Sequence, residues 1–126
     1  MGMIFSVAAG GALGAVLRYF VMLMAPLMFG TAFPYNTILV NIVGSFFMGI
    51  LVTYFNVSDS LSAELKSFLT IGLLGGFTTF SAFSLDILKM WQSDQILYAL
   101  IYGLVSVIFS VAAIFVGVLV ARNFIG

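Results

Sequence analysis

The sequence predicts an all-α membrane protein with four transmembrane helices, and three observations support this. Of its 126 residues, 63% are hydrophobic and only 6% are charged, whereas about a quarter of the residues in a soluble domain are charged. Long apolar stretches recur, separated by short polar segments. The length leaves room for about four spans of about 20 residues each and little else. We therefore expect a single transmembrane domain over residues 1–126.

The first two spans are predicted over residues 3–29 and 37–55. The first apolar stretch runs well past the length of a secretory signal, so we expect it to remain as a helix. Arg18 is the one charged side chain within it. Pro34 lies between the two spans; it fixes its own φ and biases the preceding residue toward extended backbone, which predicts a turn.

The third span, over residues 65–88, differs from the others at its centre. Ser62 precedes it as a candidate helix cap, and Glu64 places an acid in the first turn. Adjacent Gly75 and Gly76, followed by two threonines, disfavour helix. We expect the helix to break at these glycines near the middle of the bilayer. A break frees backbone carbonyls, which must then find other partners.

The fourth span is predicted over residues 95–120, with Arg122 closing it. Trp91 lies in the polar segment before this span, where an indole ring suits the headgroup region. No sequence period repeats along the chain, and no linker marks a second domain.

The residue inventory excludes several classes of chemistry. The chain has no cysteine and no histidine, which removes disulfides, thiolate nucleophiles, zinc sites and imidazole acid–base catalysis. Four basic and four acidic side chains give zero net charge, and no basic patch is available for nucleic acid. We therefore expect a protein that is not an enzyme.

The basic residues give almost no orientation signal. Four spans place Lys66 and Arg122 on one side of the membrane, and Lys89, with Arg18 if it reaches the surface, on the other. Orientation normally follows an excess of Lys and Arg in the cytoplasmic loops. Two interpretations stay open: the chain inserts both ways and pairs as an antiparallel homodimer, or so few charges carry little information.

Uncharged polar and aromatic side chains recur along one face of three predicted helices, since residues three or four apart share a face. The sets are Thr37, Asn41 and Ser45 in the second span, Ser81 and Ser84 with Phe80 and Phe83 in the third, and Tyr102, Ser106 and Ser110 in the fourth. Any one polar stripe is typical of adhesion between helices, at about 0.6 to 2 kcal/mol per hydrogen bond. Three stripes in so short a chain favour a polar pathway. Asn41 is the sharpest case, because an amide at membrane depth must find partners.

Glycines and phenylalanines each have an ordinary and a functional interpretation. Gly10 and Gly14 predict close helix packing. Carbonyls freed at the glycine break, with no carboxylate among them, suit a hard monovalent cation such as Na⁺. Phe80 and Phe83 are ordinarily apolar bulk, but the positive edges of their rings, beside hydroxyl and amide donors, suit weak multi-site binding of a small anion. Arg18 either extends to the headgroups or concentrates anions at a pore mouth.

Three motifs resemble the Fluc (CrcB) fluoride channel family. They are GGFTTFSAFS from Gly75 to Ser84, GALGAVLRY from Gly11 to Tyr19, and NTILVNIVGS from Asn36 to Ser45. The resemblance covers essentially the whole chain, and the first of these motifs is highly specific. It implies a dual-topology antiparallel homodimer with two fluoride pores.

The resemblance also implies roles for individual residues. Phe80 and Phe83 would face the pore with the Asn41 amide, Ser81 would continue a polar track, and Ser110 with Tyr102 would lie near the path. We add Thr37, which shares the Asn41 stripe, to the candidate pore residues, and we place Arg18 at a vestibule. The carbonyls of Gly75 and Thr78 from both subunits would hold a central structural Na⁺.

One position departs from the family pattern. The family usually has threonine where this chain has Ala82, so a hydroxyl next to Ser81 is missing. We expect slower conduction rather than loss of the fold.

The function implied is a fluoride-selective channel in the bacterial inner membrane that exports cytoplasmic fluoride passively. The alternative is a small multidrug-type, proton-coupled exporter, which also has four short spans but needs a membrane-embedded carboxylate, typically a glutamate in the first span. This chain has no acid before Asp59. Asp86, expected near the interface beside Lys89, is the one candidate within reach of a span. A third alternative is a non-transporting assembly subunit.

Overall fold

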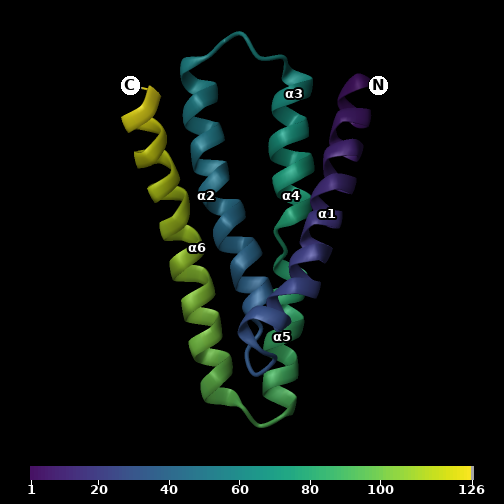
Figure 1. Ribbon diagram of the computed structural model, residues 1–126, viewed down its shortest axis with the longest axis vertical. Helices are drawn as coiled ribbons and strands as arrows, with labels where there is room; N and C mark the ends of the chain where they lie inside the picture. Colours follow the sequence, from purple (N-terminus) through teal and green to yellow (C-terminus); the bar gives the residue numbers. More distant parts are fainter. Residues whose placement is uncertain (126) are drawn as a thin grey trace.

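The computed structural model describes residues 1–125, and all its regular structure is helical (Figure 1). The elements are α1 (Gly2–Phe29), α2 (Tyr35–Val57), α3 (Ala63–Ser67), η1 (Phe68–Leu74), α4 (Gly75–Phe77), α5 (Phe80–Gln92) and α6 (Ile96–Ile125). By length and apolar composition, four helical stretches are able to cross a membrane: α1, α2, the segment Ala63–Gln92 and α6. The predicted all-α chain with four long apolar helices is confirmed.

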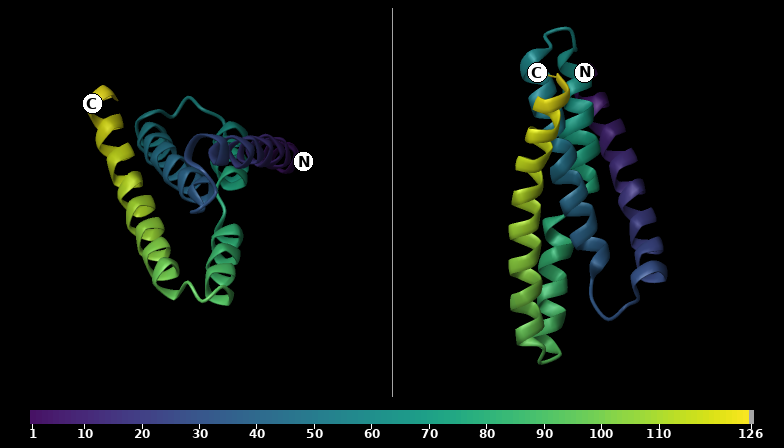
Figure 2. Two further views of the ribbon diagram at one scale, coloured as in Figure 1. Left: turned by 60° about the horizontal axis from the view of Figure 1, so that its bottom comes forward. Right: turned by 60° about the vertical axis from the view of Figure 1, so that its left-hand side comes forward.

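The two termini lie at the same end of the molecule, as an even number of passes requires (Figures 1 and 2). α2 packs chiefly against α6, and α1 packs chiefly against η1. Glycine allows both pairs of helices to approach closely. A Cβ on Gly14 would clash with the carbonyl of Leu73 in η1, and one on Gly117 would clash with the carbonyl of Phe46 in α2. The prediction that Gly10 and Gly14 serve close packing is confirmed, since a Cβ on Gly10 would clash with the carbonyl of Phe68.

The third predicted span begins as expected and then departs from prediction. Ser62 caps α3 by accepting a hydrogen bond from the Leu65 amide (3.1 Å). η1 then winds as a π-helix from Phe68 to Leu74, a form that is rare and often found at functional sites.

The glycine pair itself is helical, so the predicted break at Gly75 and Gly76 is wrong in position. Gly75 has φ −62° and ψ −38°, and extended backbone appears only at Thr78 (φ −85°, ψ 160°) and Thr79 (φ −153°, ψ 122°). Gly76 is used instead for contact with α1, because a Cβ there would come 2.7 Å from the carbonyl oxygen of Gly11. The β-branched threonines, which favour extended backbone, take up the change in direction.

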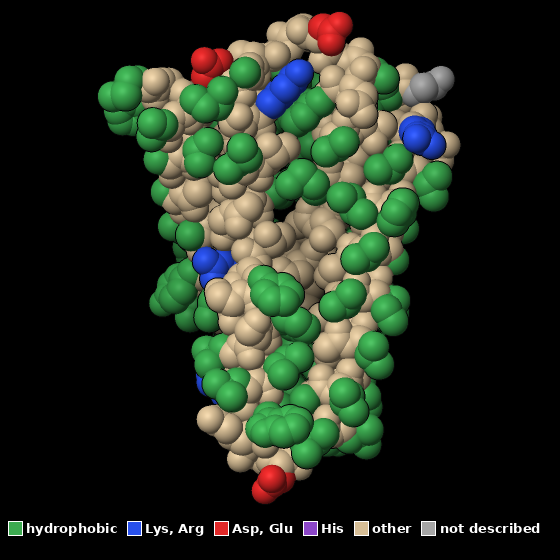
Figure 3. All heavy atoms as spheres, turned by 180° about the vertical axis from the view of Figure 1, so that it is seen from behind, with side chains coloured by type: hydrophobic (Ala, Val, Ile, Leu, Met, Phe, Trp, Pro, Cys, Tyr) green, Lys and Arg blue, Asp and Glu red, His purple; other side chains and the backbone are tan. Residues whose placement is uncertain are grey.

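On the face shown in Figure 3, apolar side chains are spread along the length of the molecule, and the acidic side chains that are visible lie at its two ends. The buried core is small and lies among α2, α5 and α6. The residues that form this buried cluster are Ile38, Phe83, Met90, Ala99 and Tyr102, and further buried apolar residues, such as Ala25 on α1 and Leu74 on η1, lie outside it. Exposed apolar surface on this scale marks contact with lipid or with another protein chain.

Candidate functional site

The polar stripes of three helices meet in one groove. This polar groove has a volume of about 310 Å³ and is bounded by α2, the Thr78–Thr79 step with the start of α5, and α6. Its lining residues are Asn41, Ser45, Thr78, Thr79, Phe80, Phe83, Ser106, Val107, Ser110 and Val111. All of them are uncharged. The groove therefore offers amide and hydroxyl dipoles and aromatic rings, but no full charge.

The Asn41 amide is joined to the extended backbone of Thr79 by two hydrogen bonds. The Thr79 amide donates to Asn41 Oδ1 at 2.8 Å, and Asn41 Nδ2 donates to the Thr79 carbonyl at 3.1 Å. This pairing meets the expectation that an amide at membrane depth finds partners. One N–H of Nδ2 remains for a ligand in the groove.

The two phenylalanines form the aromatic wall of the groove, at different depths. Phe83 is 8% exposed, whereas Phe80 is 76% exposed. Their ring centroids are 5.4 Å apart with the planes tilted by 57°. Phe83 also stacks on Tyr102, with a centroid distance of 5.2 Å. The Phe83 ring is thus held in place by its neighbours, while Phe80 stands at the open side.

Two serines of α6 bring unsatisfied hydroxyls to the groove. Ser106 Oγ and Ser110 Oγ are both buried and have no hydrogen-bond partner among the described residues. A buried hydroxyl without a partner costs about 1 to 3 kcal/mol, so such groups call for an explanation by function. Ser81 behaves differently: it is exposed, lies 3.3 Å from Thr79 Oγ1 through its hydroxyl, and does not line the polar groove.

Thr37 and Tyr102 do not line the polar groove but hold a carboxylate. Tyr102 OH donates to Asp86 Oδ2 at 2.7 Å, and Thr37 Oγ1 donates to the same oxygen at 2.9 Å. Asp86 is half-buried between α5, α2 and α6, so the expectation that it lies at the interface beside Lys89 misses its main contacts. Thr37 and Tyr102 fall on the predicted polar stripes, but the sequence analysis did not connect them with Asp86; their need for an acceptor within the membrane is the signal that could have done so.

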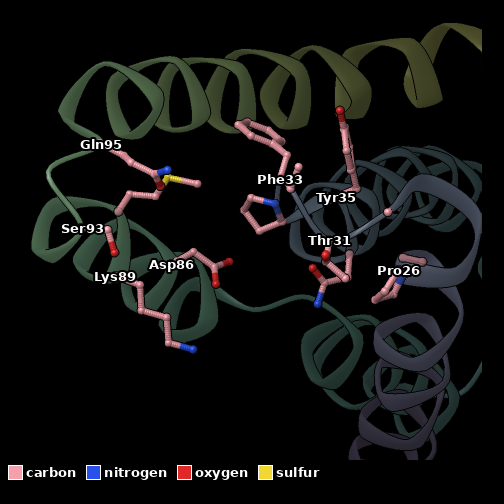
Figure 4. Close-up of a pocket in the computed structure, with 14 residues that line it drawn as sticks. Pro26, Thr31, Phe33, Tyr35, Asp86, Lys89, Ser93 and Gln95 are labelled. Carbon is pink, nitrogen blue, oxygen red and sulfur yellow. The ribbon is translucent and has the colours of Figure 1, made fainter.

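Asp86 also lines a second cavity, of about 320 Å³, beneath the α1–α2 connection. Figure 4 shows Asp86, Lys89, Ser93 and Gln95 on one side of this cavity, facing Pro26, Thr31 and Phe33 on the other. A neighbouring pocket of about 200 Å³ is lined by Arg18, Thr37, Thr79, Asp86 and Lys89 among others. Thr79 is shared between that pocket and the polar groove, so the extended step separates the two.

Arg18 contacts the third segment rather than extending away from it. Its Nε donates to the carbonyl of Gly76 at 3.1 Å, across 58 residues of sequence. Gly76 precedes the extended step by two residues, so this bond fixes the end of α4.

The carbonyls of Gly75 and Thr78 have lost the amides that a continuous helix would give them. The Thr79 amide, four residues after Gly75, donates to Asn41 Oδ1. The Ala82 amide, four residues after Thr78, donates to Thr79 Oγ1. Both carbonyls therefore lack the amide partner that a continuous helix would provide, and such carbonyls need another partner within a membrane.

Comparison with known proteins places the chain in a family. Residues 5–118 match the family described as CrcB-like protein, Camphor Resistance (CrcB). A protein of Chelativorans sp. named fluoride-specific ion channel FluC is 47% identical over 93% of this chain and 94% of its own length. Proteins of the same name from Agrobacterium fabrum and Rhizobium meliloti are each 44% identical, covering 93% and 97% of this chain and 94% and 98% of their own lengths. The chain belongs to the CrcB family of multi-pass membrane proteins.

Proposed function

We propose that this chain is a subunit of a fluoride-specific ion channel and that the polar groove is half of its conduction path. The observation that carries the proposal is a groove lined by amide, hydroxyl and aromatic groups with no charged side chain, in a chain whose relatives are named fluoride-specific ion channels. A channel must bind its ion well enough to admit it and weakly enough to release it. Uncharged donors meet that requirement better than a lysine or an arginine in the path.

The donors available to an anion are those without a protein partner. Ser106 and Ser110 hydroxyls have none among the described residues, and Asn41 keeps one free N–H. The tilted pair of Phe80 and Phe83 adds ring edges, which carry the positive part of the aromatic quadrupole. Tyr102 and Thr37 hydroxyl protons are committed to Asp86, so we assign these two residues to shaping the path rather than to direct solvation.

The groove is open on one side, and a second copy of the chain closes it in our proposal. Two copies insert in opposite orientations and pair as an antiparallel homodimer, which gives two pores. The extended step at Thr78 and Thr79 supports this, because it leaves the carbonyls of Gly75 and Thr78 without their helical amide partners. The carbonyls of Gly75 and Thr78 from both copies would hold a Na⁺ ion, whose charge their oxygens would stabilise.

Export is passive in this proposal, and the protein lies in the bacterial inner membrane. Neutral hydrofluoric acid crosses lipid and dissociates in a less acidic cytoplasm, which traps fluoride. A membrane potential of 100 mV, negative inside, favours exit of one charge by about 2.3 kcal/mol, or roughly fifty-fold in concentration. The channel therefore needs neither a nucleotide site nor a proton relay.

A proton-coupled exporter is the second candidate, and one observation favours it. The Asp86 carboxylate lies between helices with two hydroxyl donors, the kind of embedded acid that proton exchange requires. A drug-stimulated proton flux that disappears in Asp86→Asn would establish the exporter. A non-transporting assembly subunit would instead conduct nothing when purified.

The deciding experiment is ion efflux from liposomes that contain the purified protein. We expect rapid fluoride release, with chloride retained under the same potential. The matched variant is Ser110→Ala with Ser84→Ala as its control, since the Ser84 hydroxyl donates to the Phe80 carbonyl of its own helix and is not in the groove. Equal release of fluoride and chloride, or of neither ion, rejects the proposal.

A further inference from the structure

We infer that Arg18 is a positioning residue for the conduction path, and that it acts through its Nε–H rather than through its charge. Nε donates to the carbonyl of Gly76 at 3.1 Å. The guanidinium is half-buried on α1 and reaches across to the third segment. A side chain that served only to concentrate anions at a pore mouth would have no need of this bond.

The bond matters because of where Gly76 lies. The Gly76 carbonyl is at the end of α4, where a helix leaves carbonyls without amide partners. Two residues later the backbone becomes extended at Thr78 and Thr79. Arg18 thus fixes the residues just before the step, on the side facing α1.

A second side chain fixes the step from the other side. Asn41, on α2, bridges the amide and the carbonyl of Thr79 at 2.8 and 3.1 Å. α1 and α2 therefore each contribute one polar side chain that binds the backbone between Gly76 and Thr79. Thr79 in turn caps α5 by accepting a hydrogen bond from the Ala82 amide. The position of the step therefore determines where α5 begins and where the rings of Phe80 and Phe83 lie.

The consequence is that the geometry of the aromatic wall depends on a side chain that does not line the groove. Arg18 lines the pocket on the far side of Thr79, not the polar groove. Loss of its donor frees the end of α4, and the step and the Phe80 ring then move together.

Three substitutions of Arg18 separate the effect of its Nε–H donor from the effect of its positive charge. Arg18→Gln removes the charge but keeps a nitrogen donor, because Nε2 of glutamine is attached to Cδ as Nε of arginine is. Arg18→Lys keeps the charge but puts a methylene at that position. Arg18→Met puts a methyl carbon there and removes both properties.

The test measures fluoride efflux from liposomes and amide hydrogen exchange of the peptide spanning Thr78 to Ala82, with gel filtration to select folded protein. We expect Arg18→Gln to match the wild type in both. We expect Arg18→Lys and Arg18→Met to lose about tenfold in efflux and to exchange about tenfold faster. Arg122→Gln, at an exposed position near the end of α6, is the control for loss of one positive charge.

Only the efflux measurement rests on the proposed function. Wild-type liposomes that release no fluoride reject that function, and hydrogen exchange alone then decides the role of Arg18. Efflux retained in Arg18→Lys but lost in Arg18→Gln shows attraction by charge and overturns our inference. Hydrogen exchange in Arg18→Gln that is as fast as in Arg18→Met also overturns it. The same holds if neither efflux nor hydrogen exchange changes in any of the three variants. If Arg18→Met does not fold, the Gln and Lys pair gives the answer.

Discussion

At the scale of single residues, the hydroxyl groups around the groove divide into two kinds. Tyr102 and Thr37 donate to Asp86, and their geometry is fixed by this shared acceptor oxygen. Ser106 and Ser110 have buried oxygens without partners among the described residues. Sequence spacing puts all of them on similar polar stripes, yet only the second kind is available to a passing ion.

The first prediction concerns Ser106. Its buried hydroxyl has no hydrogen-bond partner within residues 1–125, so Ser106→Ala should raise the free energy of unfolding by about 1 kcal/mol, because the desolvation cost of that hydroxyl disappears. The same change should lower fluoride efflux, since a donor is lost from the path. Thermal unfolding in detergent and liposome efflux measure the two effects, and a destabilised variant with normal efflux contradicts the prediction.

The second prediction concerns Ala82, where the family resemblance implies a threonine. Ala82 is half-buried and lines the pocket that contains Arg18 and Asp86. Ala82→Thr adds a hydroxyl beside the extended step and should increase fluoride efflux with little change in stability. Efflux rates of the two proteins at equal density in liposomes provide the comparison, and equal rates reject the idea.

At the scale of elements, the packing of α2 against α6 depends on two glycines that have no room for a side chain. A Cβ on Gly49 would clash with the carbonyl of Ile114, and a Cβ on Gly117 would clash with that of Phe46. Both obstacles are backbone atoms, which cannot rotate away. This helix pair forms one wall of the polar groove and controls its width.

The third prediction follows from this packing. Gly117→Ala should destabilise the protein by about 1 to 3 kcal/mol or more, because the two helices must separate to admit the methyl group. Gly103→Ala, on the same helix, is the matched control, since its Cβ would meet only the flexible Ile87 side-chain tip at 3.4 Å. Thermal unfolding of both variants in detergent tests this; similar losses of stability in the two would be inconsistent with it.

At the scale of the whole molecule, the exposed surface is the main feature. On the face shown in Figure 3, apolar side chains are spread along the length of the molecule, and the buried cluster among α2, α5 and α6 contains only five residues. The groove opens onto that apolar outside. In our proposal, the groove is surrounded by lipid and by a second copy of the chain.

The fourth prediction concerns orientation. The chain has no cysteine, so a single Ser60→Cys reports one end, in the α2–α3 connection, and Ser93→Cys reports the other, between α5 and α6. Insertion in both directions should leave about half of each cysteine open to a membrane-impermeant thiol reagent in intact cells. Complete labelling of one cysteine with none of the other would show a single orientation and reject the antiparallel dimer.

The sequence by itself determined the four apolar helices, the turn before Pro34, the Ser62 cap and the close packing at Gly10 and Gly14. These follow from composition, periodicity and local backbone chemistry, which depend on residues near one another in the chain. The motifs also pointed to Asn41, Phe80, Phe83 and Ser110 as neighbours, and the structure brings these four into one groove.

Only the tertiary structure decided which residues contact the extended step and Asp86. The step lies at Thr78 and Thr79 rather than at the glycines, and Gly76 instead makes a close contact with α1. Arg18 reaches Gly76 across 58 residues, and Asp86 gathers hydroxyls from two other helices. These contacts join segments distant in sequence, and no local preference encodes which donor meets which acceptor until the helices have packed.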